Sequence, residues 1–192
     1  MGSRRAELPT RIQDKFSPEQ IVAVDVDRKL VNSPMGECPS CGYIGNSVDG
    51  PIDPYAASSP ACWDMFGKLR LAGLPQIGLD AYMAQHPNPS TAAGRRSILT
   101  HLVGLYIALN DFKNSDRILK ILGSVFIDKS DEVEGFAKIP SLKNITVGDV
   151  QAASVEARDS QVHNWALFVW NAWEPEHERV LNLAKSAINR LD

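Results

Sequence analysis

The chain has 192 residues, of which 44% are hydrophobic and 22% charged, and its formal net charge is −3. This length suits one domain with a core that needs no disulfides. The charge lacks the basic excess of a nucleic-acid-binding protein. No apolar run reaches the length of about 18 residues that a membrane-spanning helix needs, so no such helix is expected.

The N-terminal region, residues 1–37, is predicted to be an extension that is partly helical. Ser17, Pro18 and Gln20 together form a typical helix start, with a capping residue, a proline at the first position and a glutamine that closes the capping box. The arginines near the N-terminus are not followed by an apolar stretch, so no secretory signal is predicted and a cytoplasmic location is expected.

Between residues 38 and 60 the chain is predicted to form a loop. Glycine and proline recur there and interrupt every candidate element, at Gly42, Gly45, Gly50, Pro51, Pro54 and Pro60. A segment of this composition has little core of its own, so something else must hold it in place.

After this loop the sequence becomes helical in its periodicity. Helices are predicted over 59–73, 78–86, 90–111, 114–126, a short stretch capped by Thr146 and Asp149, 161–173, and from Pro175 towards the C-terminus. Residues 128–145 are predicted to be a loop. The fold class is therefore mainly α, with residues 38–192 forming a single helical domain that carries a small zinc knuckle at about 38–62.

The cysteines give the strongest chemical signal. Cys38 and Cys41 form a C-x2-C turn followed by glycine, which is typical of a zinc knuckle. Cys62 falls in the first turn of a predicted helix, where the helix dipole favours the thiolate that a metal requires. Three cysteines without a secretory signal argue against a disulfide framework. The alternative without a metal is that the three cysteines are simply small hydrophobic residues buried in the core.

Two other cysteine chemistries fit less well. A redox pair would need a strand, a turn and a helix around the C-x2-C turn. A zinc deaminase would need a histidine upstream of Cys38, and the sequence has none there.

A structural zinc site needs four ligands, so one more is required. The preferred candidate is His86, which ends a short helix just before Pro87 and lies one helix after Cys62. His101 is the alternative, although it is one residue from an apolar stripe and its ring more easily joins the core. His177, among carboxylates, ranks third and is expected to be solvated.

Several other residues are weaker candidates. Asp53 is a further polar group near the metal if its loop folds inward. Asp80 and Tyr82 precede His86 on one helix, and Asp80 is a candidate to orient a histidine ring. Arg95 and Arg96, in the first turns of the long helix, are candidates to bind an anion. The face of Trp165, Val169 and Trp173 is interpreted as core or interface packing, and His163 as a surface residue.

A series of short motifs gives a family resemblance. "CPSCG", "GPIDPY", "SSPACW", "DAYMAQHP", "RRS", "HLVGLY" and "VWNAW" follow one another in this order. The series resembles an uncharacterised bacterial family, a domain of unknown function, from Cys38 to the C-terminus. The resemblance implies that the three cysteines, Asp80, Tyr82, His86 and His101 occupy motif positions, but it brings no activity with it.

The sequence departs from the family pattern in two places. Asp53 stands where the pattern has histidine, and the segment before "DAY" lacks a histidine and is shortened. The resemblance therefore carries over no ligand or base at these two positions.

The sequence thus predicts a zinc-binding protein in which Cys38, Cys41, Cys62 and His86 hold a structural metal. Two alternatives stay open. One is a metal-dependent hydrolase in which water replaces one cysteine. The other is a helical interaction module that exposes its tryptophans. Whether the chain is an enzyme, which small molecule it uses and whether it forms a homo-oligomer are not fixed by the sequence.

Overall fold

The computed structural model describes residues 36–46, 53–110, 136 and 139–189, all of them within the unit that runs from Ser33 to Asp192. The helices are α1 (Pro60–Leu71), α2 (Gln76–Gln85), α3 (Ala92–Leu109), α5 (Val147–Ala152), α6 (Val155–Ala172), the 3-10 turn η5 (Glu174–Glu176) and α7 (His177–Ile188). Within these residues there is no strand, and the two β-bridges are isolated. The prediction of a mainly helical fold is confirmed.

The first helix shows how local signals set the element bounds. Ser59 caps α1 by accepting a hydrogen bond from the amide of Cys62 at 3.2 Å, and Pro60 occupies the first position. The helix ends where Gly73 adopts φ +89° and the amide of Leu74 returns to the carbonyl oxygen of Leu69 at 3.0 Å. Both ends follow the predicted capping pattern.

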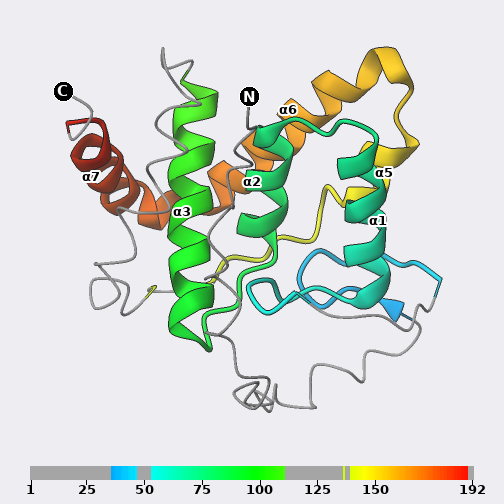
Figure 1. Cartoon of the computed structure of the whole chain (residues 1–192), viewed down its shortest axis with the longest axis horizontal. Coiled ribbons are helices and arrows are strands. Elements are labelled where there is room, and N and C mark those ends of the chain that lie inside the picture. Colours follow the sequence, from blue (N-terminus) through cyan, green and yellow to red (C-terminus); the bar gives the residue numbers. More distant parts are fainter. Residues whose placement is uncertain (1–35, 47–52, 111–135, 137–138, 190–192) are drawn as a thin grey trace, which may run out of the picture. The chain divides into compact units, whose positions relative to one another are not determined.

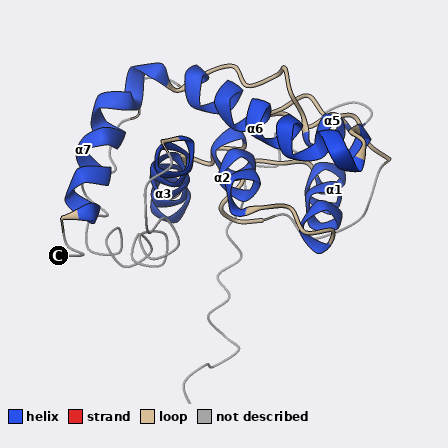
Figure 2. Ribbon diagram, turned by 90° about the horizontal axis from the view of Figure 1, so that it is seen from above, coloured by secondary structure: helices blue, strands red, loops and turns tan. Residues whose placement is uncertain are grey.

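The packing of α2 between its neighbours forms the centre of the core. In Figures 1 and 2, α2 lies between α3 and α1, and α6 runs along one side of this row. α2 packs against α3 and α6, whereas α7 packs against α3 and α5 against α1 and α6. The buried stripe of α3 includes Ile98, Leu102 and Leu105, as its periodicity predicts.

The tryptophan face of α6 points into this core. Trp165 and Val169 are fully buried, as is Trp173 at the end of the helix. The interpretation of this face as core packing is confirmed, and these residues form no exposed aromatic patch of the kind that an interaction module requires.

Some helix bounds differ from those predicted. α2 starts two residues earlier than expected, because Pro75 can precede a helix and Gly78 leaves room for the side chain of Leu74. α6 starts at Val155 because Ser154 caps it through the amide of Ala157. The short helix α5 has the predicted capping box of Thr146 and Asp149.

The predicted helices in 1–37 and 114–126 lie outside the described residues. None of the helices that the structure describes combines the length and the apolar composition needed to cross a bilayer.

Candidate metal centre

Cys38 and Cys41 lie on a tight turn closed by backbone hydrogen bonds. The amide of Gly42 donates to the carbonyl oxygen of Cys38 at 2.9 Å, and the amide of Cys38 donates to that of Tyr43 at 2.8 Å. Gly42 has φ +79°, a conformation that glycine adopts without steric cost. The amide of Tyr43 also donates to Cys41 Sγ at 3.4 Å. Such N–H groups stabilise charge on a thiolate, as in zinc knuckles.

Cys62 reaches the same point from the first turn of α1. Pro60 and Ala61 precede it in the helix, and the Ser59 cap holds its amide. The sequence places Cys62 at this position because the Ser-Pro pair begins the helix there. Its side chain is fully buried.

Backbone contacts join the three segments that carry the candidate ligands. The amide of Ala57 donates to the carbonyl oxygen of His86 at 2.9 Å, and Ala56 forms a β-bridge with Pro87. The hydroxyl of Ser40, between the two knuckle cysteines, donates to the carbonyl oxygen of Ala57 at 2.5 Å. The chain before α1 therefore connects the knuckle turn to the end of α2.

His86 is the residue that caps the C-terminus of α2. Its Nδ1 donates to the carbonyl oxygen of Tyr82 at 2.7 Å. A carbonyl oxygen can only accept, so Nδ1 carries a proton and Nε2 is the nitrogen that can bind a metal. Nε2 lies 3.3 Å from Cys62 Sγ. The imidazole is completely buried.

The sulfurs of Cys38, Cys41 and Cys62 and one ring nitrogen of His86 all lie within 4.8 Å of one another, and all four residues are buried. Cys41 Sγ and Cys62 Sγ are 3.8 Å apart. A tetrahedral ion with bonds of about 2.3 Å to sulfur separates two sulfur ligands by about 3.8 Å. The four side chains are therefore close enough together to bind one metal ion, and the distance between Cys41 Sγ and Cys62 Sγ matches tetrahedral coordination.

The proton distribution in this group is uneven. Hydrogen bonds from Cys41 and Cys62 hold the pKa of Cys38 far below its usual range. The pKa of Cys62 is raised, because it donates to Cys38 and Cys41 and is buried. Burial works to lower the pKa of His86, but hydrogen bonds to Cys38 and Cys41 raise it to about 10. Cys38 thus already favours the thiolate, the form that a metal binds, whereas Cys62 favours the neutral thiol.

Tyr82 packs directly against the candidate ligands. Its ring stacks on that of His86 with centroids 4.1 Å apart, and on Phe66 at 3.9 Å. Its hydroxyl donates to Cys62 Sγ at 3.7 Å. Burial, followed by the charge of Cys62, raises the pKa of the Tyr82 phenol, which therefore stays a donor. Tyr82 and His86 therefore lie in direct contact.

Asp80 belongs to a different contact. Its Oδ1 accepts from His101 Nδ1 at 2.7 Å, between α2 and α3, so the histidine that Asp80 orients is His101 and not His86. Asp80 Oδ2 is buried without a partner among the described residues. A Cβ at Gly104 would lie 2.7 Å from this carboxylate, so the close approach requires glycine there. His101, the alternative fourth ligand, is not in the cysteine group.

The remaining histidines and Asp53 also lie outside the group. Asp53 accepts from the amide of Tyr55 at 2.6 Å and closes a turn. His163 is exposed, as predicted. His177 is not simply solvated, because its ring stacks on Trp170 at 3.8 Å and its Nε2 donates to the Trp170 carbonyl oxygen at 2.9 Å.

The two arginines of α3 differ in their contacts. Arg95 Nη1 donates to the carbonyl oxygen of Pro89 at 2.9 Å, so one end of this guanidinium closes the loop before the helix. Arg96 is half-buried in the first turns of α3. Anion binding by this pair stays a prediction.

Sequence reasoning missed Gln85, which precedes His86 and is fully buried. Its side chain bonds to Leu142, Ile145 and Trp165. The sequence feature that could have indicated Gln85 is its place in the motif "DAYMAQHP", where a polar side chain stands between a small residue and a candidate ligand.

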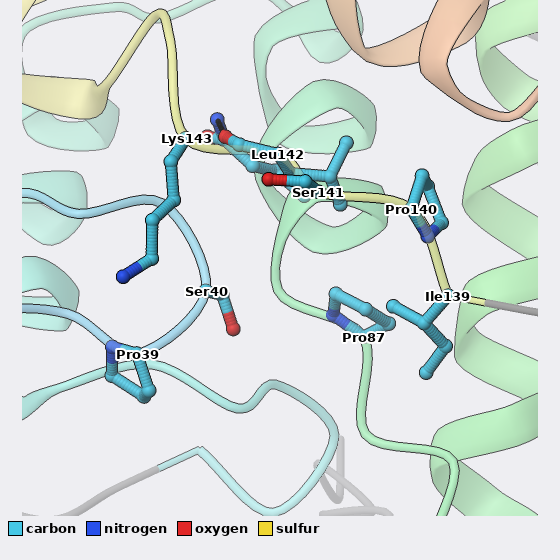
Figure 3. Close-up of a pocket in the computed structure, with 9 residues that line it drawn as sticks. Pro39, Ser40, Pro87, Ile139, Pro140, Ser141, Leu142 and Lys143 are labelled. Carbon is cyan, nitrogen blue, oxygen red and sulfur yellow. Dashed lines mark hydrogen bonds between the residues drawn. The ribbon is translucent and has the colours of Figure 1, made fainter.

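A pocket of about 210 Å³ lies beside the centre. Figure 3 shows Pro39, Ser40 and Lys143 on one side of it and Pro87 and Ile139 on the other. Some of the residues that line it, such as Pro39, Ser40 and Pro87, are neighbours of candidate ligands in sequence, and the others come from residues 139–143; none of the four ligands is among them. Lys143 also pairs with Glu37 at 2.9 Å, an exposed contact of little energetic weight.

Comparison with known proteins identifies the family but no activity. No curated protein and no solved structure matches the chain. The model of a family of unknown function, DUF5946, matches residues 36–174, which include the knuckle, α1 to α3 and all of α6. The chain therefore belongs to the DUF5946 family.

Proposed function

We propose that this chain is a zinc protein in which Cys38, Cys41, Cys62 and His86 hold one ion, and that the ion stabilises the fold. The observation that carries the proposal is the convergence of three sulfurs and one imidazole nitrogen, all buried, within 4.8 Å. These groups come from three separate segments, and all three cysteines are free thiols rather than members of a disulfide. Buried thiols that only fill space have no need to meet a histidine nitrogen at one point.

A structural role is supported by the number and burial of the ligands. Four protein ligands complete a tetrahedral zinc and leave no position for water or substrate. The knuckle turn has no regular element of its own in the described residues 36–46 beyond one β-bridge residue at each end. A bound ion would therefore supply much of the energy that fixes this turn to α1 and α2.

The hydrolase alternative receives less support. It needs an open coordination position that faces a cavity, with an acid or base beside it. The described pocket is not lined by any of the four candidate ligands. Asp80 and His101, the expected partners of such chemistry, bond to each other between α2 and α3.

The test is metal analysis of the purified 192-residue chain after dialysis without chelator. We expect about one zinc per chain. Replacement by cobalt should give the absorption of a tetrahedral thiolate site, and each of Cys38→Ser, Cys41→Ser and Cys62→Ser should weaken its charge-transfer bands. A folded wild-type protein that carries no metal and takes up no cobalt would overturn the proposal.

A further inference from the structure

Gln85 links the candidate ligand His86 to two distant parts of the core. Its Nε2 donates to the carbonyl oxygens of Leu142 at 2.8 Å and Ile145 at 2.6 Å. Its Oε1 accepts from Trp165 Nε1 at 2.9 Å. Both amide protons and the oxygen are therefore engaged, and the partners fix which end of the side chain is nitrogen.

The residue before Gln85 is held from the same side. Ala84 is fully buried, and its carbonyl oxygen accepts from Trp173 Nε1 at 3.1 Å. Carbonyl groups in the last turn of a helix lack partners within that helix. Two tryptophans, one in α6 and one at its end, thus supply contacts to the last turn of α2.

The position of His86 makes these contacts important for the metal. His86 has φ −115° and ψ 57°, so it lies outside the helical conformation, and its amide and its Nδ1 both bond to the carbonyl oxygen of Tyr82 in the last turn of α2. Helix ends fray unless outside contacts hold them. The residues immediately before His86 have such contacts, from Trp165 and Trp173.

We infer that Gln85, fixed by Trp165, is a positioning residue of the metal centre: it holds the last turn of α2 so that His86 meets the three sulfurs. This inference rests on the proposed function. It also gives the tryptophan motif near the C-terminus a role, since the indole of Trp165 holds the Gln85 amide and also meets the Tyr82 ring edge-on, although Trp165 is not itself a candidate ligand.

The experiment compares three variants of the 192-residue chain. Gln85→Met keeps the length of the side chain and removes its hydrogen bonds. Trp165→Phe removes the indole N–H and keeps an aromatic ring, so it is the milder change. Trp170→Phe is the matched control, because Trp170 is also in α6 but stacks on His177 and makes a tilted ring contact with Tyr106.

Zinc affinity is measured by competition with a chromophoric chelator, and ligand geometry by the spectrum of the cobalt form. Loss of a partner that orients a ligand lowers metal affinity roughly 10- to 100-fold. We expect such a loss for Gln85→Met, a smaller loss for Trp165→Phe and altered cobalt bands for both. Trp170→Phe should keep wild-type affinity and spectrum even if its melting temperature falls.

The outcomes are distinguishable. If Gln85→Met and Trp165→Phe melt earlier but keep wild-type zinc affinity and cobalt bands, Gln85 is only a packing residue and the inference is wrong. If Gln85→Met does not fold, the zinc affinity and the cobalt spectrum of Trp165→Phe test the inference in its place. If the wild-type chain binds neither metal, the proposed function fails and the inference fails with it.

Discussion

The Nδ1–H of His86 donates to the carbonyl oxygen of Tyr82, which lies 2.7 Å away and one helical turn earlier. This bond fixes the tautomer of His86, so that Nε2 faces the sulfurs. The same Tyr82 donates its hydroxyl to Cys62 Sγ. One residue therefore contacts two of the four candidate ligands, through its backbone and through its side chain.

Two histidine variants separate metal binding from packing. His86→Ala should lose zinc and thermal stability together, because zinc binding in such sites contributes on the order of 10 kcal/mol to folding. His101→Ala should keep zinc but lose roughly 3 kcal/mol, because the buried Asp80 carboxylate loses its 2.7 Å partner and keeps only the longer bond from the Gln76 amide at 3.3 Å. Zinc content is measured beside melting temperature. Retention of zinc and stability in His86→Ala would exclude His86 as a ligand.

Tyr82→Phe tests the hydroxyl contact with Cys62. The ring should still stack on His86 and Phe66, so the helical content should not change. Zinc affinity should fall about 10-fold, because the sulfur loses an outer hydrogen bond. Chelator competition measures the affinity, and far-ultraviolet circular dichroism verifies the fold. An unchanged affinity would mean that the 3.7 Å contact has no role in binding.

Gly104→Ala tests the close approach of α3 to Asp80. The new methyl group would lie 2.7 Å from the carboxylate, so we expect a loss of about 1–3 kcal/mol in the free energy of unfolding, with zinc retained. Gly67→Ala in α1 is the control, because nothing lies within 4 Å of its Cβ. That change should raise stability by up to about 1 kcal/mol. Equal effects of both substitutions on chemical denaturation would contradict the packing argument.

Zinc affinity should fall as the pH falls. His86, with its pKa raised to about 10, and Cys62, with a raised pKa, must each lose a proton to bind, whereas Cys38 already favours the thiolate. Binding near pH 7 should therefore release at least about two protons, which corresponds to a change of about 100-fold or more per pH unit. Calorimetry in buffers of different ionisation enthalpy counts these protons. An affinity that does not change between about pH 6 and 8 would contradict the ligand set.

The sequence predicted those parts of the fold that depend on local signals. Helix starts could be predicted because capping depends on residues that are close together in the chain, as at Ser59 with Pro60 and at Thr146 with Asp149. The C-x2-C turn is also local, and His86 was selected correctly as the histidine in the cysteine group because its position before Pro87 limits where it can lie.

Contacts between distant helices could not be predicted in the same way. The pairing of Asp80 with His101 depends on the close approach of α2 and α3. Gly104 permits this approach, but a glycine in a helix does not by itself predict one. The bond from Trp165 to Gln85 spans 80 positions. Such partners follow from tertiary packing, and no periodicity in a single sequence identifies them.

The aromatic chain around Tyr82 also provides an optical reporter. Trp165 meets the Tyr82 ring edge-on at 6.4 Å, and Trp63 lies 5.9 Å from it on the α1 side. Only the ring of Tyr82 separates each indole from His86 along this series of ring contacts. Binding of an ion at His86 should therefore change the polarity around the indoles and the quenching of their fluorescence. Intrinsic fluorescence would then follow metal loading in real time, without an added dye, and Trp63→Phe and Trp165→Phe would assign the signal to its source.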